Sequence, residues 1–264
     1  MKRAIAGVAL AATLAVAAAA TRPYWEAPDA AQAQSWLRDA ADRRDAGVEA
    51  SLARWSARGN AAARHAYATL LSHRADAPSR RRLEQLLADG ADAGDAADAT
   101  RLAELLSHAN ALEAHADKGA QGSRAGGAGE DARVARLLAQ GSAGHVPAAA
   151  RLLALRALAP AHGTPDAARA AALMADAANG GDVPAMFLLA NMLRAGQGAP
   201  RDDAKALALY QAAADADYAP AIQALAIAWR YGELGLQADA SQSRLMDHEA
   251  AEALAHAAQQ AAGS

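Results

Sequence analysis

Histidine and glutamate side chains recur at a spacing of four residues near the C-terminal end, as His248, Glu252 and His256. On a helix this spacing places all three on one face, and imidazole and carboxylate groups are ligands that Zn²⁺ accepts. Eight residues of helix rise about 12 Å, so the two imidazoles cannot both bind one ion at about 2 Å. The spacing therefore predicts an exposed helix with a favourable His–Glu pair, although His248 and Glu252 could hold an ion weakly.

A glycine-rich stretch from Gly127 to Ala132 matches the G-x-G-x-x-A pattern of dinucleotide-binding turns. Such a turn needs a strand directly before it, inside a strand–helix–strand unit. The residues from Lys118 to Ala128 are instead polar and rich in glycine. We therefore predict a flexible linker at residues 117–129 and no bound cofactor.

The sequence lacks local motifs that place a nucleophile beside a base. It contains no G-x-S-x-G turn, no H-E-x-x-H helix and no G-x-x-x-x-G-K-[ST] phosphate loop. Serine, histidine and aspartate are all present, so a triad that meets only in three dimensions stays open. We predict a protein that is not an enzyme, with no catalytic, cofactor-binding or metal-ligating residues. The alternative is an enzyme or metal-binding protein built from residues scattered over a groove.

An internal repeat in the sequence predicts the helices that carry these side chains. Pro184 to Ala190 returns as Pro220 to Ala226, and Gly196 returns as Gly232, each 36 residues later (220 − 184 and 232 − 196). A fixed period of about 20 to 50 residues is typical of solenoids of stacked supersecondary units. Residues 203–214 lie between the copies, so one unit consists of two helices and two connections.

Both helices of this unit are predicted to be amphipathic. Gly196 can take the left-handed conformation that ends the first helix, and Asp202 or Asp203 can cap the second through a side-chain oxygen. Small or apolar residues recur at helical spacing in each. They are Ala185, Leu188, Leu189, Met192 and Leu193 in the first helix, and Ala206, Leu207, Tyr210, Ala213 and Ala214 in the second.

This unit resembles the Sel-one-like repeats, a subclass of the tetratricopeptide-type helical solenoids. The chain departs from the family pattern where Ala190 and Ala226 replace a glycine, and where Asp217 stands for the closing glycine. The resemblance implies an all-α, right-handed α-solenoid of helix-turn-helix repeats that binds other proteins, in bacteria often at the cell envelope. It is carried by Ala185, Leu189-Ala190, Leu193, Gly196-Gln197-Gly198-Ala199, Asp203, Lys205-Ala206, Leu209-Tyr210 and Ala213-Ala214.

The composition suits a thin core. Aromatic residues make up 4% of the 264 residues, with one Phe, which is too little to fill a large globular interior. A solenoid needs less, because each repeat buries its apolar stripe only against its neighbours. The chain has no cysteine, which excludes disulfides and thiol chemistry.

The first twenty residues have the pattern of a secretory signal. Lys2 and Arg3 precede an uncharged run from Ala4 to Ala20 that ends in three alanines. We expect cleavage of residues 1–20 and a periplasmic or secreted protein without membrane insertion, and retention as an inner-membrane anchor is the alternative. Losing Lys2 and Arg3 changes the formal charge from −3 to −5 (−3 − 2), which argues against nucleic acid as a partner.

Weaker repeats are expected nearer the N-terminus. Gly59-Asn60-Ala61-Ala62 returns 35 residues later as Gly94-Asp95-Ala96-Ala97 (94 − 59). Between them a helix is predicted to start at Pro78 and to stop at Gly90. The predicted organisation is a signal peptide (1–20), a tether (21–28), degenerate repeats (29–116), a linker (117–129), and further repeats with a capping helix (130–260).

A binding surface is predicted on the first helix of each repeat, which lines the concave side in solenoids of this type. Exposed aromatic and arginine side chains anchor many protein partners. The candidate residues are Phe187, Asn191, Arg194, Gln223, Ile227, Arg230 and Tyr231. Packing against neighbouring helices is the competing explanation for the same residues. We therefore predict a non-enzymatic scaffold or adaptor of the bacterial envelope that binds another protein.

Overall fold

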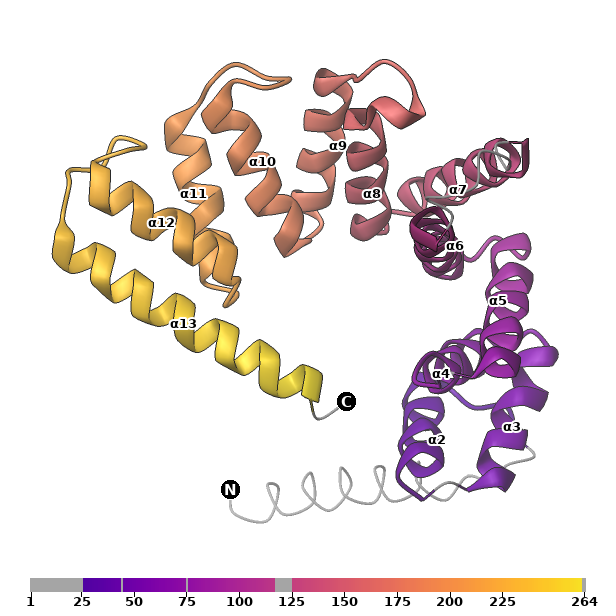
Figure 1. The fold of residues 1–264 in the computed structure, drawn as a ribbon. Coiled ribbons are helices and arrows are strands. Elements are labelled where there is room, and N and C mark those ends of the chain that lie inside the picture. Colours follow the sequence, from indigo (N-terminus) through magenta and orange to yellow (C-terminus); the bar gives the residue numbers. More distant parts are fainter. Residues whose placement is uncertain (1–25, 44, 75, 117–124, 263–264) are drawn as a thin grey trace, which may run out of the picture. The chain divides into compact units, whose positions relative to one another are not determined.

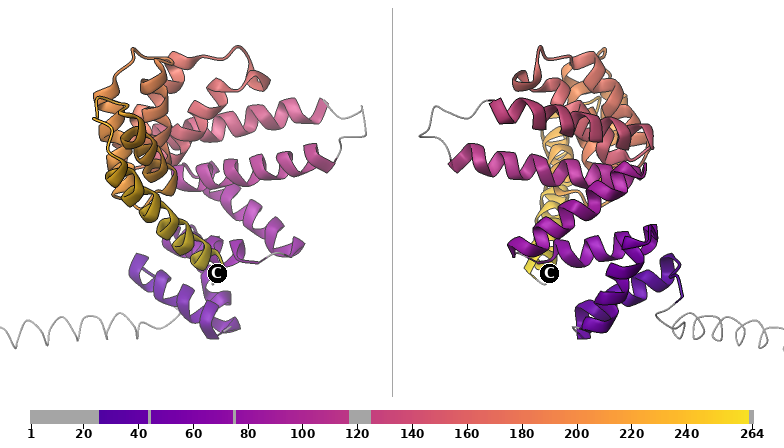
Figure 2. Two further views of the ribbon diagram at one scale, coloured as in Figure 1. Left: turned by 60° about the vertical axis from the view of Figure 1, so that its left-hand side comes forward. Right: turned by 90° about the vertical axis from the view of Figure 1, so that its right-hand side faces the viewer.

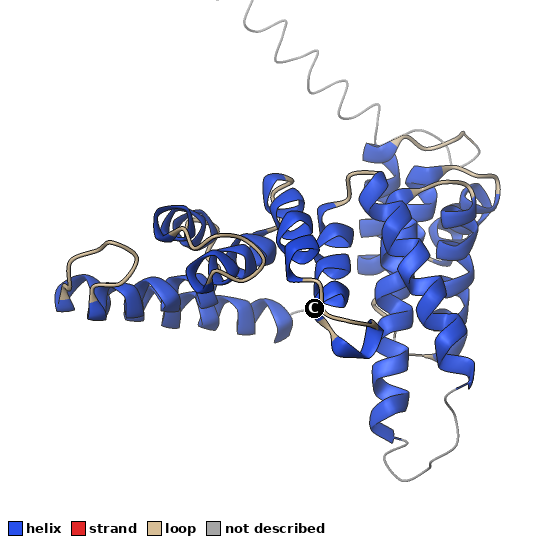
Figure 3. Cartoon of the chain, turned by 90° about the horizontal axis from the view of Figure 1, so that it is seen from above, coloured by secondary structure: helices blue, strands red, loops and turns tan. Residues whose placement is uncertain are grey.

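The computed structural model describes residues 26–43, 45–74, 76–116 and 125–262. These ranges fold into α-helices and one short 3₁₀ helix, without a strand (Figure 3). The predicted all-α class is therefore confirmed. The predicted signal at residues 1–20 and most of the predicted tether lie outside the described residues.

The chain divides into two compact units, and the first comprises residues up to Asp98. It contains α2 (Ala30–Arg43), α3 (Ala46–Ala57), α4 (Ala61–Ser72), α5 (Ala77–Asp92) and the first turn of α6 (Ala96–Ala116) (Figure 1). Helix α4 packs against α2, α3 and α5. Helix α4 therefore lies among the other helices near the N-terminus, and the degenerate repeats predicted at residues 29–116 stay a prediction.

The second unit runs from Ala99 and holds the clearer repeats. Each helix from α7 to α13 packs against the next one along the chain. Figure 2 shows these helices, coloured from magenta to yellow, from two further sides. The helices are α7 (Ala125–Ala143), α8 (Pro147–Leu158), α9 (Ala167–Asn179), α10 (Val183–Ala195), α11 (Asp203–Ala214), α12 (Ala219–Tyr231) and α13 (Ala240–Ala262), with the 3₁₀ helix Pro160–His162 after α8.

Most helices in both units begin at an aspartate or asparagine. The side-chain oxygen of each accepts hydrogen bonds from backbone N–H groups of the first helical turn, which have no partner inside the helix. These residues are Asp45, Asn60, Asp76, Asp166, Asp182 and Asp202, and Asp29, Asp95 and Asp239 accept equivalent bonds at the starts of α2, α6 and α13. Asp202 and Asp203 were both predicted as possible caps of α11. Asp202 is the N-cap residue, and Asp203 is the first residue of the helix.

The turn between α10 and α11 depends on two glycines. Gly196 ends α10 with a φ of 66°, as predicted, and Gly198 has a φ of 76°. A Cβ on Gly198 would lie 2.0 Å from the backbone oxygen of Ala167, at the start of α9. The second glycine therefore lets this turn approach the preceding repeat. Asp217, in place of the family's closing glycine, also has a positive φ of 56°, which aspartate tolerates better than most residues.

The core of the second unit is thin and rich in alanine. Alanines such as Ala185 and Ala206 are fully buried and let neighbouring helices approach closely. Larger side chains fill the remaining space, mainly Met174, Leu189, Met192, Leu193, Tyr210 and Leu225. This agrees with the core expected from so few aromatic residues.

Two predicted boundaries are wrong. Helix α5 does not stop at Gly90 but continues to Asp92, because Gly90 makes room for other side chains rather than ending the helix. Helix α7 begins at Ala125, so the last five residues of the predicted linker (125–129) are helical, and residues 117–124 lie outside the described part. The structure separates its two units between Asp98 and Ala99, and the predicted domain organisation stays a prediction.

Within the described ranges, no helix combines the length and the apolar character needed to cross a membrane.

Candidate functional site

Phe187 and Asn191, two of the predicted binding residues on α10, take part in packing. The Phe187 ring contacts Tyr210 and Tyr218, with centroid distances of 5.8 and 5.6 Å. Asn191 Oδ1 accepts a hydrogen bond of 2.7 Å from the Tyr210 hydroxyl. Burial raises the pKa of Tyr210, so this hydroxyl keeps its proton and remains a donor. Both predicted residues therefore hold α11 against α10.

The two predicted arginines form exposed ion pairs. Arg194 of α10 donates to Glu233 Oε2 at 3.2 Å, and Glu233 lies in the turn that follows α12. Arg230 donates to Ser243 Oγ at 3.2 Å and to Asp247 Oδ2 at 2.5 Å, and both acceptors belong to α13. Arg230 thus ties α13 to α12, and both arginine side chains keep much of their surface in solvent.

The remaining predicted residues share one exposed side of α12. Gln223, Ile227 and Tyr231 follow one another at a spacing of four, and we call this set the α12 face. Ile227 is 43% exposed and Tyr231 is 68% exposed, which is unusual for side chains of this kind in a helix otherwise packed against α11 and α13. Of the seven predicted residues, Ile227 and Tyr231 present exposed apolar surface, and the polar Gln223 lies one turn before Ile227.

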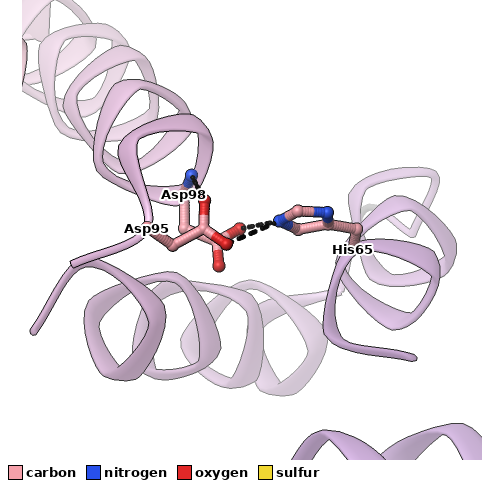
Figure 4. Close-up of side chains that lie close together, drawn as sticks. All are labelled: His65, Asp95 and Asp98. Carbon is pink, nitrogen blue, oxygen red and sulfur yellow. Dashed lines mark hydrogen bonds and ion pairs between the residues drawn. The ribbon is translucent and has the colours of Figure 1, made fainter. Parts of the chain in front are cut away.

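A second cluster lies in the first unit and was not predicted from the sequence. His65 belongs to α4, Asp95 precedes α6, and Asp98 lies in the first turn of α6 (Figure 4). The His65 Nε2 atom lies 3.0 Å from Asp95 Oδ2 and 3.4 Å from Asp98 Oδ1. Asp95 holds its position because its Oδ1 accepts hydrogen bonds from the backbone N–H groups of Ala97 and Asp98.

Arg64, the residue before His65, balances part of the negative charge. Its Nη2 donates to Asp95 Oδ2 at 2.8 Å, and its Nε donates to Asp98 Oδ2. Burial alone would lower the pKa of Arg64, but its hydrogen bonds and ion pairs with Asp98 and Asp95 raise it. The guanidinium is therefore permanently charged although it is nearly buried.

The two carboxylates differ in their surroundings. Burial raises the pKa of Asp98, which is fully inaccessible to solvent, and the hydrogen bond from Arg64 acts against this shift. Burial acts in the same direction on Asp95, but the N–H of Asp98 and the charges of His65 and Arg64 bring its pKa below the usual value. Asp98 Oδ1 is buried and accepts no hydrogen bond. One buried carboxylate oxygen of the cluster is thus left facing the His65 imidazole.

Gly90 of α5 creates the space for this cluster. A Cβ at Gly90 would lie 2.0 Å from Asp98 Oδ2 and 2.7 Å from Arg64 Nε, distances that no side chain could tolerate without displacing the pair. The glycine is therefore required by the approach of two charged side chains to the backbone of α5.

A related contact recurs in the second unit. Arg151 of α8 donates through Nε to both carboxylate oxygens of Asp182, at 2.9 and 3.0 Å, and Asp182 caps α10. The sequence separation is 31 residues, as it is between Arg64 and Asp95. In both units an arginine on one repeat thus holds the N-cap aspartate of the next. The sequence repeat at residues 59–62 and 94–97 was the signal that could have located the first of these pairs.

The histidine-containing helix near the C-terminus behaves as predicted. His248 Nδ1 lies 3.7 Å from Glu252 Oε1, and both side chains are largely exposed on α13. The two side chains thus form the predicted His–Glu pair of an exposed helix.

Comparisons with known proteins support the fold. The chain is similar to a Sel1 repeat protein from Oxalobacter formigenes, with a TM-score of 0.64 and 16% identity over 84% of this chain and 85% of the other. It is also similar to a protective antigen of uropathogenic Escherichia coli that displays an SLR fold, with a TM-score of 0.60 and 19% identity. That match covers 88% of this chain but 53% of the antigen, so the chain spans about half of the antigen's length.

No protein-family model matches the chain, and no curated protein matches its sequence. At these identities the structural likeness shows the fold, which is the predicted Sel1-like helical repeat fold.

Proposed function

We propose that this protein is an interaction scaffold that binds a segment of another polypeptide through the α12 face. The observation that carries the proposal is the exposure of Ile227 and Tyr231 at adjacent turns of α12, at 43% and 68%. Two apolar side chains four residues apart form a continuous stripe on a helix, and such stripes receive the apolar positions of a partner peptide. The repeat fold supports this function, since stacked helix pairs offer extended surfaces for binding.

The surroundings of the α12 face suit a polypeptide more than a small ligand. Gln223 supplies a polar group at one end, and Glu233, which pairs with Arg194, follows Tyr231 by two residues in the sequence. An apolar centre with a polar rim is the usual arrangement of a protein interface. The assignment of the protein as non-enzymatic is part of this proposal.

Site-specific photo-crosslinking in cells tests the proposal. A photoreactive amino acid at Gln223 should give one dominant adduct with another polypeptide, and the double substitution Ile227→Asp with Tyr231→Ala should abolish it. The matched control carries the photoreactive residue at Leu254 of α13, which is also about half exposed but lies outside the α12 face. An adduct that forms equally at Leu254, survives the double substitution or contains a second copy of this chain contradicts the proposal.

We further propose that the protein is exported to the periplasm or beyond. The support is the pattern of Lys2 and Arg3 followed by the uncharged residues 4–20. The intact mass of the protein from an envelope fraction should correspond to a chain lacking residues 1–20. A full-length mass in the membrane fraction would favour an inner-membrane anchor instead.

A further inference from the structure

The contact between Arg64 and Asp95 has a simpler counterpart elsewhere in the molecule, which shows what such a contact needs. Arg151 and Asp182 lie 87 residues further along the chain (151 − 64 and 182 − 95) and make the same link between helices. At the same offset, Leu152 corresponds to His65. An arginine and an N-cap aspartate are therefore sufficient to join successive repeats.

The first unit contains two further residues beside the Arg64–Asp95 contact, Asp98 and Gly90, which the Arg151–Asp182 contact lacks. Asp98 corresponds to the buried Ala185, and Gly90 corresponds to the buried Ala177. A fully buried second carboxylate costs solvation energy, and it also needs a glycine in the last turn of α5, where glycine is a weaker helix former than alanine. Neither feature is needed to hold the helices together, so both call for another explanation.

The oxygen Oδ1 of Asp98 indicates that the cluster binds an ion. It is buried, accepts no hydrogen bond and lies 3.4 Å from His65 Nε2. Buried polar atoms without a partner are rare in folded proteins, and an ion is one of the groups that satisfies them. The three atoms His65 Nε2, Asp95 Oδ2 and Asp98 Oδ1 all lie within 4.8 Å of one another.

These distances fit the coordination of a first-row divalent metal. Bonds of about 2.0–2.2 Å in a tetrahedral site place neighbouring ligand atoms about 3.3–3.6 Å apart. His65 Nε2 lies 3.0 Å from Asp95 Oδ2, with which it shares a hydrogen bond, and 3.4 Å from Asp98 Oδ1, so small shifts would bring both pairs to the spacing of metal ligands. The charges fit as well, because two carboxylates and the Arg64 guanidinium have a net charge of −1 (−2 + 1), and an imidazole binds a metal ion in its neutral form.

We propose that His65, Asp95 and Asp98 form a site for a divalent metal ion of the Zn²⁺ class. One imidazole nitrogen and two carboxylate oxygens are ligands that Zn²⁺ accepts, and solvent completes the coordination. Access is from the His65 side, whose side chain is 38% exposed, while the Asp98 side chain is inaccessible. Arg64 holds the other oxygen of Asp98 and also donates to Asp95 Oδ2, so it orients both carboxylates but weakens the affinity for a cation.

Calorimetric titration of the chelator-treated full chain with ZnCl₂ tests the site. The wild-type protein should bind one equivalent, and His65→Gln should weaken this binding at least about tenfold, the lower limit found for losing even a supporting residue of a metal site. The matched control is His248→Gln, which removes an exposed histidine that also lies beside a carboxylate. It should leave the affinity unchanged.

The histidine ring signals of the wild-type protein give an independent readout that requires no variant to fold. Addition of one equivalent of Zn²⁺ should move the ring nitrogen signals of His65 and leave those of His248 in place. The proposal is wrong if the chain binds no Zn²⁺ at one equivalent, if His65→Gln binds it as tightly as the wild type, or if the ion moves the His248 signals instead.

Discussion

At the scale of single residues, two glycines of this protein are required for different reasons. Gly198 has a positive φ and approaches the backbone of Ala167, so two separate constraints require a glycine there. Gly90 lies inside a helix with no conformational need for glycine, and only the nearby Asp98 and Arg64 side chains exclude a Cβ. A glycine in a sequence therefore does not reveal by itself whether it ends a helix or admits a neighbour.

Replacing Gly90 by alanine tests this interpretation. The new methyl group would lie 2.0 Å from Asp98 Oδ2, so the buried ion pair must shift, and we expect a loss of about 1–3 kcal/mol in the free energy of unfolding. Urea unfolding followed by far-UV circular dichroism measures it. The control is Gly129→Ala in α7, where a Cβ meets no atom within 4 Å.

The control should change stability in the opposite direction. Alanine favours a helix over glycine by about 0.5–1 kcal/mol, so Gly129→Ala should stabilise the protein slightly. If Gly90→Ala is as neutral or stabilising as Gly129→Ala, the buried pair does not depend on the missing Cβ.

At the scale of helices, an aspartate at the N-cap can do two things at once. Asp202 accepts a hydrogen bond from the N–H of Lys205 and caps α11 while its side chain remains exposed. Asp182 makes the equivalent bond to Ala185 and also receives Arg151 from α8. The same residue type therefore acts within one helix in the first case and joins two repeats in the second.

Substituting each of these aspartates by alanine separates the two effects. Asp202→Ala removes only the cap and should cost about 1 kcal/mol in the free energy of unfolding. Asp182→Ala removes the cap and also leaves the partly buried Arg151 without this carboxylate, so it should cost about 1 kcal/mol more. Equal losses in urea unfolding would mean that the Arg151–Asp182 contact contributes nothing beyond the cap.

At the scale of the whole molecule, stability is expected to be local. Each repeat of a helical stack contacts mainly its neighbours along the chain, so the stability of the stack is a sum of repeats and interfaces between neighbours. The second unit agrees with this, because the main contacts among its described helices from α7 to α13 join helices that are next to one another along the chain. Substitutions in one unit should therefore act mainly on that unit.

Hydrogen exchange of the native protein measures this locality. Gly90→Ala should lower the protection of amides in α4 and α5 and leave those of α10 to α12 unchanged, whereas Asp182→Ala should do the reverse. A uniform loss of protection across both units in either variant would show that the chain unfolds as a single cooperative body.

The sequence alone was sufficient to predict the helices, the repeat class and the α10–α11 turn. Each of these depends on neighbours in the chain: apolar spacing, an N-cap oxygen within reach of the next turn, and the positive φ of Gly196. It also placed Ile227 and Tyr231 on one side of α12, since residues four apart share a helical face.

Only the tertiary structure decided which side chains meet. In the sequence, Phe187 and Asn191 were candidates for binding a partner as much as Ile227 was. The structure places both against Tyr210. The sequence could not show this, because packing depends on how neighbouring helices are placed. The structure also brought His65 together with Asp95, 30 residues later in the sequence, and with Asp98. Contacts between repeats depend on the spacing and angle of whole helices and on the space a glycine leaves, and no local pattern in the sequence encodes these.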